Sequence, residues 1–202
     1  MAPKHLRYST ILAPPEGNVI VYRDFFDQQT SNIYFTRLLT EIEWQQQHIK
    51  LYGRDILQPR LTAWHGEPGI RYRYSGITLT AHCWTETLYA IKQALKIVVA
   101  APFNSVLLNL YRNGNDSMSW HSDDEKELGT HPAIASVSLG ASRRFQFKHK
   151  HDNTLAKINL ELADGSLLIM QGDTQHNWKH QLPKVRKPLA PRINLTYRVI
   201  GQ

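Results

Sequence analysis

The spacing of apolar residues changes along the chain from a helical period to the alternation that is typical of strands. Apolar residues recur at helical intervals in residues 30–44 and 85–99, which predicts two helices. From Ser105 onward, short alternating runs are separated by turn residues such as Gly140 and Asp164-Gly165, which predicts strands. The predicted strands cover residues 106–111, 134–139, 145–148, 157–162, 166–170 and 192–199.

This order of elements predicts the α+β fold class, with the helices first and packed outside an antiparallel sandwich or jelly-roll barrel. We expect a Pro-rich N-terminal tail over residues 1–18 and a single domain over 19–202, a length that can bury a core. No apolar run reaches the length of a membrane span, and the N-terminus has no signal-peptide pattern. With one cysteine, Cys83, the chain cannot form an internal disulfide, which favours a reducing compartment.

The formal charge of the chain is +7, from 24 Lys and Arg residues against 17 Asp and Glu residues. A basic domain favours a polyanionic partner such as nucleic acid, because Lys and Arg side chains that contact phosphates release counterions. A net charge also keeps a protein soluble, so a plain role in solubility stays open. Heptad repeats are absent, so nothing predicts a coiled-coil dimer, and we expect a monomer.

A histidine and a carboxylate two residues apart, His121 and Asp123, form a candidate metal site. In an extended segment both side chains point to the same face and can reach one ion. His180 is the candidate third ligand, because two His and one carboxylate make the facial triad of non-haem Fe(II) oxygenases. Zinc also accepts these ligand types, so the triad alone does not select iron. Competing ligands are the other histidines of the region, His131, His149, His151 and His176.

The predicted strand 192–199 has one apolar face and one polar face, and the polar face carries Arg192, Asn194, Thr196 and Arg198. Burying two Arg side chains requires an anion, and a guanidinium matches a carboxylate, so this face predicts a dicarboxylate site. The two Arg residues lie about 20 Å apart along a strand, so each should serve a different end of the ligand. The alternative is a solvent-exposed outer face, which is common in antiparallel sheets.

The predicted strand 106–111 adds Asn109 and Tyr111 on one face. An amide and a phenol can donate hydrogen bonds to an anionic ligand, or they can satisfy backbone groups instead. Both are therefore candidate contacts of the same ligand.

These motifs, in this order, resemble the motif set of the AlkB family of dioxygenases over residues 24–200. The resemblance rests on Asn109-Leu110-Tyr111, His121-Ser122-Asp123, His180 and Arg192-x-Asn194-x-Thr196-x-Arg198. Residues 120–125, 135–141 and 189–196 are similar to the branch that contains the second and third AlkB homologues. The resemblance implies a double-stranded β-helix at about residues 105–202, with Fe(II) as the metal and His121, Asp123 and His180 as its ligands.

The resemblance also implies 2-oxoglutarate and O₂ as co-substrates. In such a site Arg192 pairs with the distal carboxylate of 2-oxoglutarate, assisted by Tyr111. The implied partners of the C1 carboxylate end are Asn194 and Arg198. The remaining implied co-substrate contacts are Asn109 and Thr196.

The implied activity is oxidative dealkylation of bases of the N1-methyladenine and N3-methylcytosine type in DNA or RNA, with release of formaldehyde and succinate. The implied location is the cytoplasm of a bacterium or the nucleus of a eukaryote. Three alternatives stay open: an RNA-specific demethylase, a cupin-like nucleic-acid-binding protein with a metal but no turnover, and a plain basic nucleic-acid-binding module.

Residues 45–80 are the implied substrate-recognition segment, since an enzyme that acts on a base must take it out of the stack and hold it. Cations alternate with aromatic side chains in residues 71–76, which resemble the family segment that stacks on the flipped base. Tyr74 is the stacking candidate opposite His121, and the further pocket candidates are Tyr72, Ser75 and Asp124. The alternative is a hairpin edge with surface tyrosines.

Residues 51–54 resemble the apolar wedge that fills the vacated stack in the duplex-active branch. Tyr52 occupies the tip, where a Phe is expected. The candidate phosphate contacts are Arg60, Arg143, Arg144, Lys184, Arg186 and Lys187.

Overall fold

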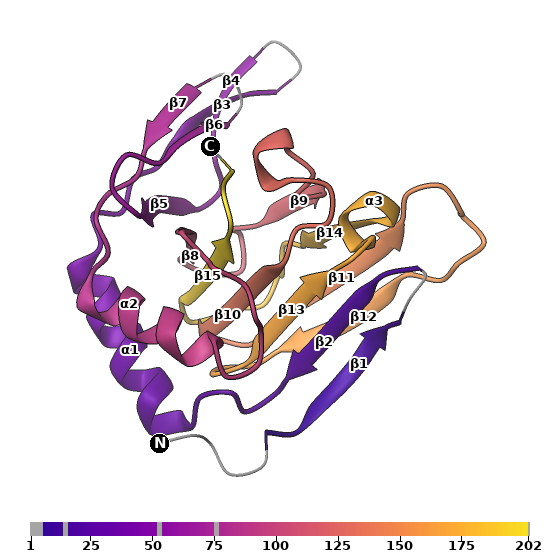
Figure 1. Cartoon of the computed structure of the whole chain (residues 1–202), viewed down its shortest axis with the longest axis horizontal. Coiled ribbons are helices and arrows are strands. Elements are labelled where there is room, and N and C mark those ends of the chain that lie inside the picture. Colours follow the sequence, from indigo (N-terminus) through magenta and orange to yellow (C-terminus); the bar gives the residue numbers. More distant parts are fainter. Residues whose placement is uncertain (1–5, 14–15, 52–53, 75–76, 202) are drawn as a thin grey trace.

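The structure is a computed structural model that describes residues 6–13, 16–51, 54–74 and 77–201, with the backbone alone for residues 49–51, 54, 71–74 and 77–80. Two antiparallel sheets pack against each other (Figure 1). The larger sheet has the strand order β1 (Tyr8–Leu12), β2 (Asn18–Tyr22), β13 (Leu167–Gln171), β10 (Ile134–Gly140), β15 (Arg192–Arg198), β8 (Ser105–Tyr111) and β5 (Leu61–Gly66). The smaller sheet has the order β12 (Ile158–Leu162), β11 (Arg143–His149), β14 (Trp178–Leu182) and β9 (Met118–His121).

Two helices cover the outer face of the larger sheet, as the order of elements predicted (Figure 1). They are α1 (Gln28–Glu41) and α2 (Glu86–Leu95). Each begins after a capping side chain, because Asp27 accepts from the backbone N–H of Thr30 and Thr85 accepts from that of Leu88. No helix among the described residues has the length and apolar character of a membrane span.

The alternation of the central strands builds two cores, one on each face of the larger sheet. Leu108 of β8 and Leu195 of β15 point toward the helices and join the first core. Tyr111 of β8 and Met170 of β13 point toward the smaller sheet and pack with its apolar residues, among them Phe147. The second face of the larger sheet therefore looks into the space between the sheets, where a site can be enclosed.

The predicted N-terminal tail is wrong over part of its length. Residues Tyr8–Leu12 form an edge strand whose Tyr8 lies opposite Tyr22, and β2 already begins at Asn18. The sequence pattern missed β1 because its first side chains are exposed, so no alternation of apolar residues marks it. The β-helix also begins earlier than residue 105, since β1, β2 and β5 all belong to the larger sheet.

The segment 45–80 contains two hairpins that extend beyond β5 (Figure 1). The first pairs β3 (His48–Leu51) with β4 (Arg54–Leu57), and the second pairs β6 (Arg71–Tyr74) with β7 (Ile77–Thr80). Backbone bonds from Thr62 to Gln45 and from His82 to Trp64 connect the ends of these hairpin segments to β5. The segment predicted to recognise substrate is thus attached to the edge of the larger sheet.

Three short features shape the loops around the smaller sheet. A 3-10 turn, η1 (Lys126–Leu128), follows β9, and the helix α3 (Thr174–Asn177) joins β13 to β14. Gly140 ends β10 with a φ of 85°, a backbone conformation that favours glycine. A Cβ atom there would lie 2.6 Å from the carbonyl oxygen of Pro191, so the turn into β11 requires a glycine.

Candidate active site

A polar cavity lies between the two sheets, lined on one side by β8 and β15 and on the other by β9, β11 and β14. The polar face of β15 points into it, and its four residues are between 2% and 9% exposed. The alternative of a solvent-exposed outer face is therefore wrong for this strand. The lining includes all six side chains that the motifs assigned to 2-oxoglutarate: Asn109, Tyr111, Arg192, Asn194, Thr196 and Arg198.

The three predicted metal ligands meet in this cavity. His121 ends β9, Asp123 follows it, and His180 lies directly opposite His121 on β14. One ligand atom from each residue lies within 4.8 Å of the others. The Nε2 atom of His121 is 3.7 Å from Oδ1 of Asp123. His180 is therefore the residue that lies beside His121 and Asp123, and none of the competing histidines belongs to this cluster.

Neighbouring groups orient the two residues of the His-x-Asp pair. The Nδ1 atom of His121 lies 2.8 Å from the carbonyl oxygen of Ser119, so it donates there and leaves a lone pair on Nε2. The backbone N–H of Asp123 donates to Oε1 of Gln175 at 2.9 Å. Arg198 donates from Nη2 to Oδ2 of Asp123 at 2.7 Å. Oδ2 is thereby occupied, and Oδ1 is the oxygen that faces His121.

The electrostatics of the cluster set the protonation states that a metal needs. Burial disfavours the Asp123 carboxylate, but the charge of Arg198 and the two imidazoles outweigh it and hold the pKa of Asp123 well below its usual range. Burial, reinforced by His121, lowers the pKa of His180 to about 3. At neutral pH the cluster is therefore one anionic oxygen donor with a neutral imidazole at His180, a donor set that fits Fe(II).

Arg192 marks the far end of the polar face of β15. Its side chain is buried, Nη2 donates to the Ser138 hydroxyl at 2.9 Å, and Cζ lies 5.4 Å from the centre of the Tyr111 ring. Burial lowers the pKa of Arg192 to about 10, so the group stays charged at neutral pH. Nε is buried without a hydrogen-bond partner among the described residues. A buried cation with a free donor fits a carboxylate ligand.

The amide and hydroxyl side chains between these two ends are held by the protein itself. Asn194 donates from Nδ2 to the Ser136 hydroxyl at 2.7 Å, and Thr196 donates to Oδ1 of Asn194 at 3.1 Å. Oδ1 of Asn109 accepts from Nε of Arg60 at 2.7 Å. The cavity wall is thus fixed before any ligand arrives.

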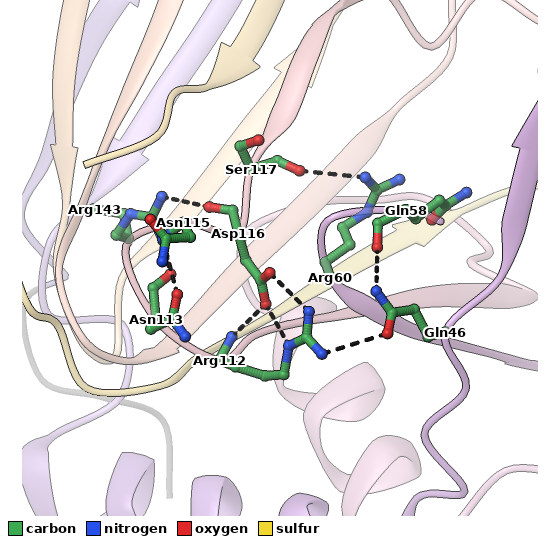
Figure 2. A network of polar contacts seen from close by, with 9 residues as sticks. All are labelled: Gln46, Gln58, Arg60, Arg112, Asn113, Asn115, Asp116, Ser117 and Arg143. Atoms are coloured by element: carbon green, nitrogen blue, oxygen red, sulfur yellow. Dashed lines mark hydrogen bonds and ion pairs between the residues drawn. The ribbon is translucent and has the colours of Figure 1, made fainter. Parts of the chain in front are cut away.

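Two of the predicted phosphate contacts, Arg60 and Arg143, are wrong, because both guanidinium groups are buried and bonded inside the protein (Figure 2). Besides Asn109, Arg60 bonds the carbonyl oxygen of Ser117 at 3.3 Å. Arg143 donates to three carbonyl oxygens, those of Asn113, Asp116 and Pro183, at 2.9–3.2 Å. The number of charged residues in a sequence does not show that these two cations are buried and form hydrogen bonds inside the protein.

Figure 2 shows that the loop between β8 and β9 is bonded to residues of the segment 45–80 on one side and to Arg143 on the other. The buried Asp116 carboxylate accepts from the backbone N–H, Nε and Nη2 of Arg112 at 2.8–2.9 Å. Arg112 also reaches Oε1 of Gln46, whose Nε2 donates to the carbonyl oxygen of Gln58. On the other side, Arg143 lies 5.7 Å from the centre of the Tyr111 ring. Asp116 therefore fixes a loop that both regions contact.

The other phosphate candidates, Arg144, Lys184, Arg186 and Lys187, are exposed. The first three line one surface depression together with Glu161. They remain available for an anionic partner, and their role stays a prediction.

The structure describes only some of the residues of the predicted base pocket. Asp124 is exposed, and its carboxylate pairs with Lys150 at 2.9 Å rather than lining the cavity. The backbone of Tyr72 and Tyr74 lies in β6, while their side chains, and the whole of Tyr52 and Ser75, lie outside the described residues.

Sequence reasoning missed several residues that support the site. Ser136 and Ser138 alternate with apolar residues in a strand that was predicted, so the signal that identified the polar face of β15 could also have found them. Gln175, Ser119 and Asp116 carry no such signal, because their partners are brought to them by loops and by strand pairing.

Residues 18–198 match the 2OG-Fe(II) oxygenase superfamily, and the chain belongs to it. The chain is 38% identical over 202 residues to human alpha-ketoglutarate-dependent dioxygenase alkB homolog 3, covering 96% of this chain and 70% of the relative. It is 38% identical over 194 residues to human DNA oxidative demethylase ALKBH2, covering 92% and 74%. These relatives confirm the resemblance to the branch of the second and third AlkB homologues.

The bovine alkB homolog 3 is 40% identical over 184 residues, which cover 87% of this chain and 64% of the bovine protein. The chain thus spans less than two thirds of the length of that relative. A solved structure entitled "The structure of OsALKBH1" superposes with a TM-score of 0.63 at 15% identity, over 94% of this chain and 99% of that one, which supports the fold. Membership of the superfamily implies Fe(II) and 2-oxoglutarate, and the donors of the cavity fit both.

Proposed function

We propose that this chain removes alkyl groups from nucleic-acid bases by Fe(II)- and 2-oxoglutarate-dependent oxidation. The observation that carries the proposal is that His121, Asp123 and His180 share one cavity with the buried, charged Arg192. Relatives of the chain named DNA oxidative demethylase point to bases in DNA as the substrate. The basic charge of +7 agrees with a nucleic-acid partner.

Each residue of the cavity has a defined task in this proposal. A bound Fe(II) would supply the activation of O₂ that couples oxidation of 2-oxoglutarate to succinate and CO₂ with hydroxylation of the alkyl carbon, and a hydroxylated N-methyl group would leave as formaldehyde. Asp123 and the two histidines hold the metal, and Arg198 fixes Oδ2 of Asp123 so that Oδ1 is presented to the ion. Arg192 binds the distal carboxylate, while Asn194, Thr196 and Asn109 shape the wall between the two ends.

The substrate side of the proposal rests on the hairpins of residues 45–80 and on the partly exposed ring of His121. We assign Tyr74 as the aromatic side chain that stacks on the flipped base, with Tyr72 and Ser75 as its neighbours in the pocket. Tyr52 is the residue that fills the vacated stack of a duplex. N1-methyladenine and N3-methylcytosine are the expected lesions, in DNA or in RNA.

The test is formaldehyde release from oligonucleotides that contain a single N1-methyladenine or N3-methylcytosine. We expect release that requires both Fe(II) and 2-oxoglutarate and that disappears in the Asp123→Ala variant. Matched single-stranded DNA, duplex DNA and RNA then distinguish a DNA demethylase from an RNA-specific one. Binding of 2-oxoglutarate without formaldehyde release from any of these substrates would overturn the proposal and favour a cupin-like binding protein.

A further inference from the structure

A second group of metal-ligand side chains lies on the surface, apart from the cavity. His131 follows η1, whereas Asp173 and His176 belong to the start and the body of α3. One ligand atom from each lies within 4.8 Å of the others, the same limit that the buried cluster meets. The side chains of His131 and Asp173 are 61% and 46% exposed, so an ion in solution can reach them.

The carboxylate of Asp173 is directed toward the imidazole of His131 and not toward the helix that it precedes. Asp173 occupies the N-cap position of α3, where an Asp normally accepts from a backbone N–H of the first turn. It makes no such bond, in contrast to Asp27, which caps α1. Instead its Oδ1 atom lies 3.2 Å from Nδ1 of His131. The capping interaction is therefore replaced by a contact between two ligand groups.

The imidazole of His176 is oriented in the way that metal-binding histidines are. Its Nε2 atom bonds the carbonyl oxygen of Thr130, and because a carbonyl can only accept, Nε2 carries the hydrogen. The lone pair is then on Nδ1. A ligating His commonly donates its other ring N–H to a backbone carbonyl, which fixes its tautomer and its ring plane. The rings of His131 and His176 are 5.5 Å apart and nearly perpendicular.

We propose that His131, Asp173 and His176 form a second divalent-metal site that takes Zn²⁺ or a similar borderline transition ion. Two imidazoles and one carboxylate suit such ions, whereas Mg²⁺ and Ca²⁺ prefer oxygen ligands. Two donors on one Zn²⁺ at tetrahedral angles lie about 3.4 Å apart. The separation of 3.2 Å between His131 and Asp173 is close to that value. Water would complete the coordination, because the site is open.

An ion at this position would join the loop that follows Asp123 to α3. That helix also carries Gln175, whose Oε1 accepts the backbone N–H of Asp123. The surface ion would therefore brace the wall of the cavity that presents the iron ligand, without touching the cavity itself. The inference does not depend on the proposed activity, because it concerns metal binding alone.

The experiment is a calorimetric titration of the metal-free protein with Zn²⁺. We expect two equivalents for the wild type, one for His180→Ala, one for His176→Ala, and none for the double variant. Asp173→Asn keeps the shape of the side chain and should weaken the second site at least tenfold. His48→Ala removes an exposed histidine of β3 and serves as the matched control, with two equivalents. Millimolar Mg²⁺ should not displace the surface ion.

Two results would overturn the second site: one equivalent in the wild type that His180→Ala removes, or two equivalents retained in both His176→Ala and Asp173→Asn. His180 is buried, so His121→Ala provides a second background if His180→Ala fails to fold. In a folded background that lacks the first site, Zn²⁺ should raise the unfolding temperature, and His176→Ala should abolish the rise. An unchanged rise would mean that Zn²⁺ stabilises the protein elsewhere.

Discussion

Replacing Arg192 by Met separates the cost of burying this cation from its value in binding 2-oxoglutarate. Arg192 is 2% exposed, and its hydrogen-bond partners, the Ser138 hydroxyl and the Tyr111 phenol, are neutral. A buried charge without an anion is costly, and Met fills a similar volume without the charge. Without co-substrate, Arg192→Met should therefore be as stable as the wild type or more stable. Its affinity for 2-oxoglutarate should nevertheless fall.

The size of this loss follows from the interaction that is removed. A hydrogen bond to a charged group contributes about 1.5–3 kcal/mol, which corresponds to a roughly 10- to 150-fold weaker affinity. At a 2-oxoglutarate concentration of about 100 times the wild-type Kd, binding stabilises the wild type by about 2.7 kcal/mol and a tenfold weaker variant by about 1.4 kcal/mol. For a protein of this length the difference of about 1.3 kcal/mol is about 3–5 °C in unfolding temperature.

The assay is thermal unfolding with and without 2-oxoglutarate, with Mn²⁺ in place of Fe(II) to prevent turnover. Arg37→Met removes an exposed guanidinium of α1 and should leave the co-substrate shift unchanged. An equal shift in Arg192→Met and wild type would refute the assignment of Arg192 to the distal carboxylate. Strong destabilisation of Arg192→Met without co-substrate would show instead that this cation supports the fold.

Three further substitutions test the metal centre, the loop and the wedge. Asp123→Ala should abolish formaldehyde release and most iron binding, because it removes the anionic ligand of the buried cluster; near-wild-type turnover would exclude Asp123 from the metal site. Asp116→Asn should lower the free energy of unfolding in urea by about 1–3 kcal/mol at pH 7, a range reduced because Arg112 is partly exposed. Burial raises the pKa of Asp116, but the hydrogen bonds from Arg112 outweigh it and lower that pKa. The difference in free energy of unfolding between the wild type and Asp116→Asn should therefore shrink as the pH falls below about 4, and a difference that stays constant with pH would contradict this. Tyr52→Ala should lose about fivefold or more on duplex substrates and little on single strands, given roughly 1–3 kcal/mol per stacked base, and equal losses would remove the wedge assignment.

The strands of the larger sheet that enclose the site were predictable because alternation is a local property of the sequence. In β15 every second residue faces the cavity, so the polar face could be identified before its partners were known. The edge strand β1 was not predictable in this way, since pairing with β2 orders it while its first side chains remain in solvent. The hairpins β3–β4 and β6–β7 likewise depend on backbone pairing between strands of four residues each.

Two neighbouring arginines show why charge alone was a poor predictor of phosphate contacts and which pattern would have predicted better. Arg143 and Arg144 have the same charge and adjacent positions, yet Arg143 is buried and Arg144 is exposed. Alternation in β11 places Arg143 on the same face as Phe145 and Phe147, which both join the core between the sheets. The periodicity of the strand, applied to its charged end, would therefore have assigned Arg143 to the interior. A phosphate contact is better sought among cations on the face opposite the apolar residues.

The pair between Arg198 and Asp123 could not be read from any local pattern, because 75 positions separate the two residues. Sequence spacing assigned Arg198 to one end of a dicarboxylate, and it does line the cavity. Closure of the two sheets also brings its charge to Asp123, where burial is outweighed by Arg198 together with the two imidazoles and the carboxylate stays ionised. A motif therefore identifies which residues face a site. The role of each residue depends on its contacts with residues distant in sequence, and these contacts form only when the chain folds.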